Sequence, residues 1–122
     1  MILSEGDLKS VVQDYLQVQQ NQGKLIFLQL FSGNLIFTNS DDSYRRRVRG
    51  CAAGTADYIV TRSAGDSPAC IQRLVDFIEL KSARGRQTPE QKEFQRLVEA
   101  QGCGYHIIKS LEELQKIIPL TS

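Results

Sequence analysis

The stretch from residue 70 to residue 109 constrains the fold of this chain more than any other, because strand and helix signals alternate along it. The run CIQRLVDFIELK (70–81) is typical of a strand that becomes apolar toward its end. Thr88-Pro89-Glu90-Gln91 then gives an N-cap, a proline at the first helical position and a capping glutamine, and Gly102 ends the helix. YHIIK (105–109) predicts a second strand. A strand, a helix and a strand in this order favour helices packed on a sheet.

The rest of the chain adds further elements of both kinds. Two apolar runs, 25–31 and 35–37, flank a Ser-Gly-Asn turn and form either a hairpin or one bent strand. The small-residue run GCAAGT (50–55) can approach another backbone or a ligand closely. We also expect a helix over 4–22 that begins at Ser4, a strand over 57–62, and a last helix that begins at Ser110 and ends at Pro119. The fold class is therefore α/β, a mixed sheet flanked by helices.

Length and composition exclude several classes of protein. The 122 residues predict a single domain over 1–122, and 24% charged against 41% hydrophobic residues is ordinary for a globular chain. The sequence has no apolar run long enough to span a bilayer and no signal-peptide layout, so we expect a cytoplasmic protein without a membrane partner. Three separated cysteines and one histidine do not indicate a zinc site, and we expect buried or half-buried thiols in a reducing compartment.

Two acidic residues lie at the ends of predicted strands, at positions that a purely structural core does not explain. Asp57 begins one predicted strand, and Glu79-Leu80-Lys81 ends the next. Because strand side chains alternate, Glu79 and Lys81 share one face while Leu80 points into the core. If the two strands are antiparallel neighbours, Asp57 lies beside Glu79, and a proton or a cation must separate the carboxylates. Carboxylates, with the Leu80 carbonyl as a third oxygen, suit Mg²⁺ or Mn²⁺.

The alternative is an exposed ion pair at a strand end, which is common and contributes little to stability. Asp57 and the basic loops on both sides give weight to a site instead. Deprotonating a lysine near neutral pH costs roughly 4 to 5 kcal/mol, so we favour Lys81 as a charged group that orients water and stabilises the transition state. A general-base role for Lys81 stays open. The outline is that of metal-assisted phosphodiester hydrolysis.

These residues, taken together, resemble a known family. GTAD (54–57), IELK (78–81), GRQTPEQKEF (85–94) and GCGYHII (102–108) resemble the virus-type replication-repair nuclease (VRR-Nuc) domain of the PD-(D/E)XK superfamily. The resemblance covers nearly the whole chain. It implies an αβββαβ core followed by a C-terminal helix, and a stand-alone nuclease of the kind found in phages and bacteria.

The resemblance also assigns roles residue by residue. It implies that Asp57 and Glu79 bind the metal, that Lys81 is the catalytic lysine, and that Gln91 and Glu5 belong to the site. The chain departs from the family at Ala56, where a proline is frequent, and in a long connection between Asp57 and Glu79.

Local explanations compete with several of these roles. Gln91 can simply complete the capping box with Thr88, and an acid such as Glu5 is favoured in a first helical turn by the helix dipole. A charge run is usually a solvated loop, yet an extended strand would present three arginines of the run 45–49 on one side. The DNA-backbone contacts that we expect are Arg45, Arg46, Arg47, Arg49, Arg84 and Arg86.

The leading hypothesis is a Mg²⁺- or Mn²⁺-dependent, structure-selective DNA endonuclease. The resemblance implies products with 5′-phosphate and 3′-hydroxyl ends, a homodimer, and branched substrates such as Holliday junctions or flaps. The alternative is a non-catalytic DNA-binding module on the same fold. A nuclease that acts on RNA is a weaker third possibility.

Overall fold

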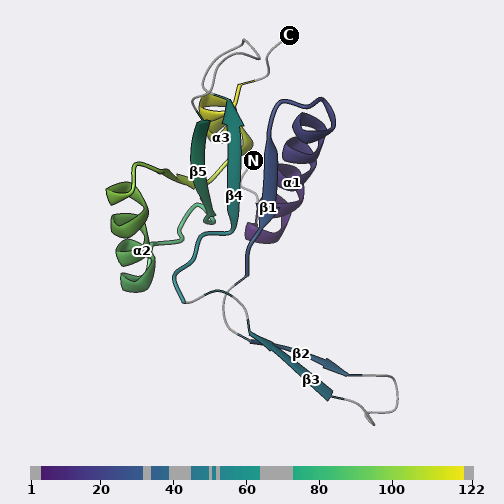
Figure 1. The fold of residues 1–122 in the computed structure, drawn as a ribbon, viewed down its shortest axis with the longest axis vertical. Helices are drawn as coiled ribbons and strands as arrows, with labels where there is room; N and C mark the ends of the chain where they lie inside the picture. Colours follow the sequence, from purple (N-terminus) through teal and green to yellow (C-terminus); the bar gives the residue numbers. More distant parts are fainter. Residues whose placement is uncertain are drawn as a thin grey trace.

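The structure, a computed structural model, describes residues 4–31, 34–38, 45–49, 51, 53–63 and 73–119. Three helices and six strands follow one another along these residues in a mixed order (Figure 1). The α/β class is therefore confirmed. The elements are α1 (Glu5–Asn21), β1 (Ile26–Gln29), β2 (Asn34–Thr38), β3 (Arg45–Arg49), β4 (Tyr58–Ser63), β5 (Arg73–Leu80), α2 (Pro89–Ala100), β6 (Gly104–Ile108) and α3 (Leu111–Ile117).

The main sheet has four strands in the order β1-β4-β5-β6. β1 pairs with β4, and β4 with β5, in antiparallel fashion, whereas β5 and β6 are parallel. The mixed strand direction expected from the sequence is confirmed. The parallel pair follows from the connection through α2, because a helix between two strands returns the chain to the same end of the sheet.

Helices cover both faces of this sheet. On β5, Ile78 and Leu80 face the core formed with α1 and α3, where they are 0% and 1% exposed. Phe77 lies on the other face, and its ring meets Phe94 of α2 edge-on with centroids 5.2 Å apart. Apolar residues therefore lie on both faces of β5 near its end, but Asp76, which is buried and pairs with Arg62 and His106, interrupts the apolar run that the sequence predicts. The core cluster comprises Leu8, Val12, Leu16, Leu25, Tyr58, Val60, Ile78, Leu80, Ile108, Leu114 and Ile118.

All three helices begin where the sequence predicts. The hydroxyls of Ser4 and Thr88 each accept the backbone N–H three residues on, at 3.1 Å. Ser110 does the same with the N–H of Glu113 at 3.2 Å, but the Glu113 carboxylate accepts from the backbone N–H of Lys109 instead of completing a reciprocal box. Within the described residues, no helix has the length and apolar character needed to cross a bilayer.

The two apolar runs near residue 33 form β1 and β2, which do not pair with each other, so the hairpin prediction is wrong; residues 32–33, on which the bent-strand alternative depends, lie outside the described residues. β1 takes its hydrogen bonds from β4, with Phe27 opposite Val60. β2 pairs instead with β3, so that Leu35 lies opposite Val48 in a separate two-stranded sheet. This β2–β3 ribbon stands away from the main sheet (Figure 1). The sequence did not reveal this because β1 takes its partner β4 from beyond the intervening β2–β3 ribbon, and apolar patterning alone does not identify a partner so far along the chain.

The cysteines follow the prediction only in part. Cys103 is half-buried, as expected. Cys51 is exposed, so the expectation of a buried thiol is wrong there. Its backbone N–H donates to the carbonyl of Phe31 at 2.7 Å, which places it after the ribbon and away from the helices that cover the core. Cys70 lies outside the described residues.

Candidate functional site

Asp57 is fixed where the chain enters β4. Its backbone N–H donates to the carbonyl of Ile78 at 3.0 Å, and its own carbonyl accepts from the N–H of Leu30 at 2.7 Å. Its carboxylate oxygen Oδ2 accepts the N–H of Leu80 at 2.7 Å. The Asp57 carboxylate therefore accepts a hydrogen bond from the backbone of β5, just beyond the last residue pair that joins β4 and β5. Its carboxylate is held against the last residues of β5.

Gly54 sets the approach of the chain to Asp57. Its φ is +89°, a conformation that side chains with a Cβ rarely adopt. A Cβ here would collide with the backbone carbonyl of Glu90 and lie 2.9 Å from the backbone nitrogen of Gln91. The small-residue run thus approaches a backbone, one of the two possibilities that the sequence left open. This contact packs the segment before Asp57 against the first turn of α2.

Glu79 lies beside Asp57, as predicted. Tyr58 is paired with Ile78 in the antiparallel register of β4 and β5, so the adjoining positions Asp57 and Glu79 are neighbours. The Glu79 side chain is buried, with 3% of the residue exposed, and its oxygen Oε1 has no hydrogen-bond partner. A buried and unpartnered carboxylate oxygen is costly, so this atom calls for a proton or a cation.

The surroundings favour the protonated form of Glu79. The pKa of Glu79 is raised to about 9, chiefly by burial and then by a hydrogen bond with Asp57 and by the negative charge of Asp57. The charge of Lys81 lowers the pKa, and the charge of Glu5 raises it. The carboxyl pair therefore retains a proton near neutral pH unless a cation takes its place. Four predicted site residues lie within electrostatic reach of one another.

Lys81 follows β5 directly and is half-buried. Its backbone N–H donates to the carbonyl of Ile108 at 3.0 Å, which fixes it to the end of β6. The loop after it turns back over its side chain: a Cβ on Gly85 would lie 3.3 Å from two of the lysine's carbon atoms. The backbone N–H of Gly85 donates to the carbonyl of Ser82 at 2.9 Å and closes that turn. The aliphatic part of Lys81 is thereby enclosed.

Gln91 and Glu5 differ from the other predicted site residues because each also has a local role at the start of its helix. The side-chain oxygen Oε1 of Gln91 accepts the backbone N–H of Thr88 at 2.8 Å, so Gln91 completes the capping box. Its local explanation is therefore present, and a role of its amide group in the site stays a prediction. Glu5 is exposed in the first turn of α1, and its charge reaches Glu79. Glu5 thus has both the helix-terminal position and the proximity that the sequence suggested.

A cationic cavity of about 770 Å³ adjoins these residues. The predicted DNA-contact residues Arg84 and Arg86 line it together with Lys81, so the structure brings them to the same cavity as the predicted catalytic lysine. The strand β3 confirms an extended conformation for Arg45, Arg46, Arg47 and Arg49. Their side chains lie outside the described part of the structure. The cavity lining consists of Lys81, Ala83, Arg84, Gly85, Arg86, Gln87, Lys92, Ile107 and Lys109.

Sequence reasoning missed several residues at this place. Lys92 and Lys109 add two cations to the cavity. The charges of Glu79 and Asp57 contribute to raising the pKa of Tyr105, although burial is the largest cause. Tyr105 therefore also lies near the carboxyl pair. Lys109 could have been found from the sequence, because the residues that follow two parallel strands, here β5 and β6, meet at one edge of the sheet. Lys92 and Tyr105 required the packing of α2 and β6 to be known.

The residues present fit a divalent ion of the magnesium type. Within the described ranges, no three His, Cys, Asp or Glu side chains form a cluster that could hold a metal. Mg²⁺ is, however, typically bound through one or two carboxylates, with waters and phosphates as its other ligands. Asp57 and Glu79 supply such a pair, and the unpartnered Glu79 oxygen is an available ligand atom. A third ligand from the Leu80 carbonyl stays a prediction.

Known proteins give no guide to this arrangement. No family model matches the chain, and searches of the curated proteins and of the solved structures find no match. The site is therefore defined by its own geometry: a carboxyl pair in which Glu79 is buried and Asp57 half-buried, an adjacent half-buried lysine, and a cationic cavity that this lysine lines.

Proposed function

We propose that this chain is a divalent-metal-dependent nuclease that hydrolyses phosphodiester bonds in structured DNA. One observation carries the proposal. The carboxyls of Asp57 and Glu79 are held together where two strands end, and the positive charge of Lys81 acts on Glu79. Because the site opens beside a cavity rich in cations, its chemistry suits an anionic phosphate substrate.

The order of the elements supports the family assignment that we propose. Apart from the β2–β3 ribbon, the chain runs helix, three strands, helix, strand, helix. This is the αβββαβ order with a C-terminal helix that the resemblance to VRR-Nuc and PD-(D/E)XK nucleases implies. The acidic residues and the lysine occupy the ends of the second and third sheet strands, where that resemblance places them.

Each residue has a distinct task in the proposed reaction. Asp57, oriented by the N–H of Leu80, and Glu79, with its open oxygen, would hold the divalent ion. When bound, Mg²⁺ or Mn²⁺ lowers the pKa of a water molecule and neutralises charge on the phosphate. Lys81 orients the phosphate and stabilises the negative charge that develops on it. Arg84 and Arg86 hold the backbone of the nucleic acid from the loop that covers Lys81.

Branched substrates and a homodimer belong to the same proposal. Both rest on the resemblance alone, and so does a phage or bacterial origin. Sedimentation equilibrium of the purified chain, with and without a four-way junction, measures the oligomeric state. The arginines of β3 would extend the contact with DNA away from the cleaved bond, since the ribbon stands apart from the main sheet (Figure 1).

A cleavage assay tests the proposal. Labelled four-way junction, flap and duplex DNA are incubated with Mg²⁺, Mn²⁺ or EDTA. We expect metal-dependent cleavage that falls at least about 100-fold in Asp57→Asn and in Lys81→Gln. Asparagine retains an oxygen that can accept the Leu80 N–H, so Asp57→Asn removes the charge while keeping this hydrogen bond.

Asp14→Asn is the matched control, because Asp14 is exposed on α1. It should cleave as the wild type does. Binding of DNA in EDTA without cleavage under any metal would contradict the proposal and favour a non-catalytic DNA-binding module. Equal cleavage by wild type and Asp57→Asn would also contradict it.

A further inference from the structure

The cavity beside Lys81 concentrates positive charge. Five of its lining residues are cationic: Lys81, Arg84, Arg86, Lys92 and Lys109. The described lining contains no carboxylate. Across the described residues, the ion pairs lie elsewhere, at Asp76 and between Glu93 and Arg96. Among these five, the Lys109 ammonium has a backbone partner, the carbonyl of Ala83 at 3.3 Å.

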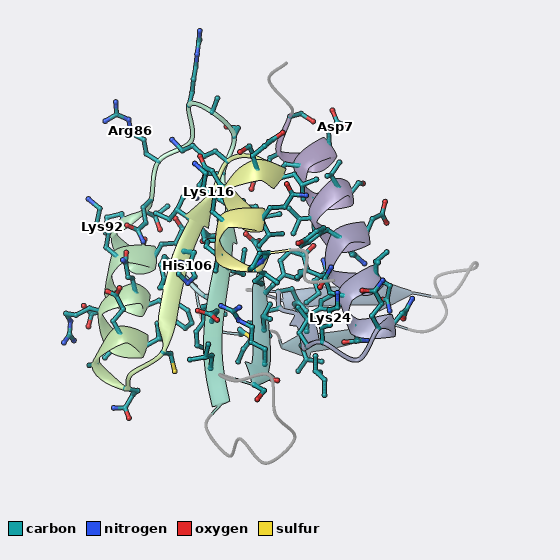
Figure 2. All side chains as sticks on the ribbon, turned by 90° about the horizontal axis from the view of Figure 1, so that it is seen from above. Asp7, Lys24, Arg86, Lys92, His106 and Lys116 are labelled. Atoms are coloured by element: carbon teal, nitrogen blue, oxygen red, sulfur yellow. The ribbon has the colours of Figure 1, made fainter. Side chains whose placement is uncertain are left out.

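Three separate segments bring these cations together. The loop after β5 supplies Arg84 and Arg86, the first turns of α2 supply Lys92, and the residue after β6 supplies Lys109. Arg86 and Lys92 lie on the same side of the molecule, away from Lys24 (Figure 2). Convergence of like charges from different elements raises the electrostatic energy of the empty cavity. An anionic ligand would remove that cost.

The size of the cavity limits what this ligand can be. About 770 Å³ falls within the range of small-molecule sites and exceeds what a lone phosphate fills. A duplex would lie across the mouth of such a hollow, whereas a single nucleotide can enter it. The wall also contains Ile107, a hydrophobic residue that is 36% exposed and can contact a sugar or a base.

The cavity shares one residue with the candidate site and contains the strand neighbour of another. Lys81 belongs to both, and Ile107 is the register partner of Glu79 in the parallel pair of β5 and β6. We therefore propose that this cavity binds an unpaired nucleotide and its phosphate next to the scissile bond. The inference rests on the proposed nuclease function for the meaning of "scissile" and names its substrate class: DNA with a single-stranded segment at the cleaved position.

Binding without metal tests the inference independently of cleavage. A fluorescein-labelled twelve-residue thymidine oligonucleotide and a blunt duplex are titrated in EDTA at several salt concentrations. The double variant Lys92→Gln/Lys109→Gln removes two cavity cations that are not among the predicted DNA-backbone contacts. Each lost phosphate contact lowers the slope of log K against log salt by about 0.7 for single strands. Because the cavity holds one phosphate, we expect the slope to fall by about 0.7 and single-strand affinity to fall about tenfold or more at low salt, with duplex affinity changed less than about threefold.

Lys24→Gln is the control, since Lys24 lies on another side of the molecule (Figure 2). It should leave both affinities unchanged, and far-ultraviolet circular dichroism and the melting temperature verify that each variant is folded. An unchanged single-strand slope in the double variant overturns the inference, and so does an equal loss on single strand and duplex. A chain that binds in this way but never cleaves would refute the nuclease proposal alone.

Discussion

Replacing Glu79 by glutamine should make the metal-free protein more stable at neutral pH. The carboxyl has an ordinary pKa of 4.5, which the folded protein raises to about 9. Between these values the unfolded chain releases the proton and the folded chain keeps it. A raised carboxyl pKa therefore favours the folded state fully at low pH, and this contribution declines as the pH rises from 4.5 toward 9.

The magnitude follows from the size of this interval. At pH 7.5 the wild type has lost stability over about three pH units, which corresponds to about 4 kcal/mol. Glutamine does not ionise and escapes this loss. Its buried amide, however, meets the same unpartnered surroundings as the Glu79 oxygen, which costs about 1 to 3 kcal/mol. The net expectation is that Glu79→Gln is about 2 kcal/mol more stable than wild type at pH 7.5.

Urea denaturation in EDTA from pH 5 to pH 9 measures the effect. The free energy of unfolding of the wild type should fall with pH, whereas that of Glu79→Gln should stay nearly level. Glu99→Gln, at an exposed position of α2, should reproduce the wild-type profile. Mn²⁺ should stabilise the wild type by about 2.7 kcal/mol at a hundred times its Kd, and should leave Glu79→Gln unchanged. A wild-type profile that is flat up to pH 8, or a less stable glutamine variant there, would refute the reasoning.

Three further substitutions test other parts of the structure. Gly54→Ala should lower stability by about 2 kcal/mol or more and weaken cleavage, because its Cβ would collide with the Glu90 carbonyl at a positive φ; thermal unfolding and the cleavage assay measure both effects. Asp76→Asn should cost about 2 kcal/mol at pH 7, since the hydrogen bond that the Asp76 carboxylate accepts from His106 holds its pKa below 3.8. That stabilisation is present above pH 4 and lost as the pH falls through the lowered pKa, so urea denaturation at pH 7 and pH 3 should show the variant's deficit shrinking in acid. Thr88→Ala should cost about 1 kcal/mol through loss of the cap on α2, measured as a lower melting temperature, and an unchanged melting temperature would contradict this role.

The sequence alone determined the parts of this protein that depend on near neighbours. Ser4, Thr88 and Ser110 each cap a helix because a hydroxyl needs only the backbone three residues on. The strand character of residues 73–80 follows from a short apolar run. The adjacency of Asp57 and Glu79 required one added assumption, antiparallel pairing of their strands, and that pairing is present.

Only the tertiary structure decided which distant segments meet. The partner of β1 is β4, which follows the β2–β3 ribbon in the chain, because strand pairing joins segments that meet only in the folded sheet. The parallel pairing of β5 and β6 brings Lys109 to the cavity that Lys81 lines. The raised pKa of Glu79 is likewise a tertiary property, because burial and the charge of Asp57 exist only once the sheet has closed around them. Local sequence thus fixes where elements begin and end, whereas ionisation and charge convergence arise from contacts between residues far apart in the chain.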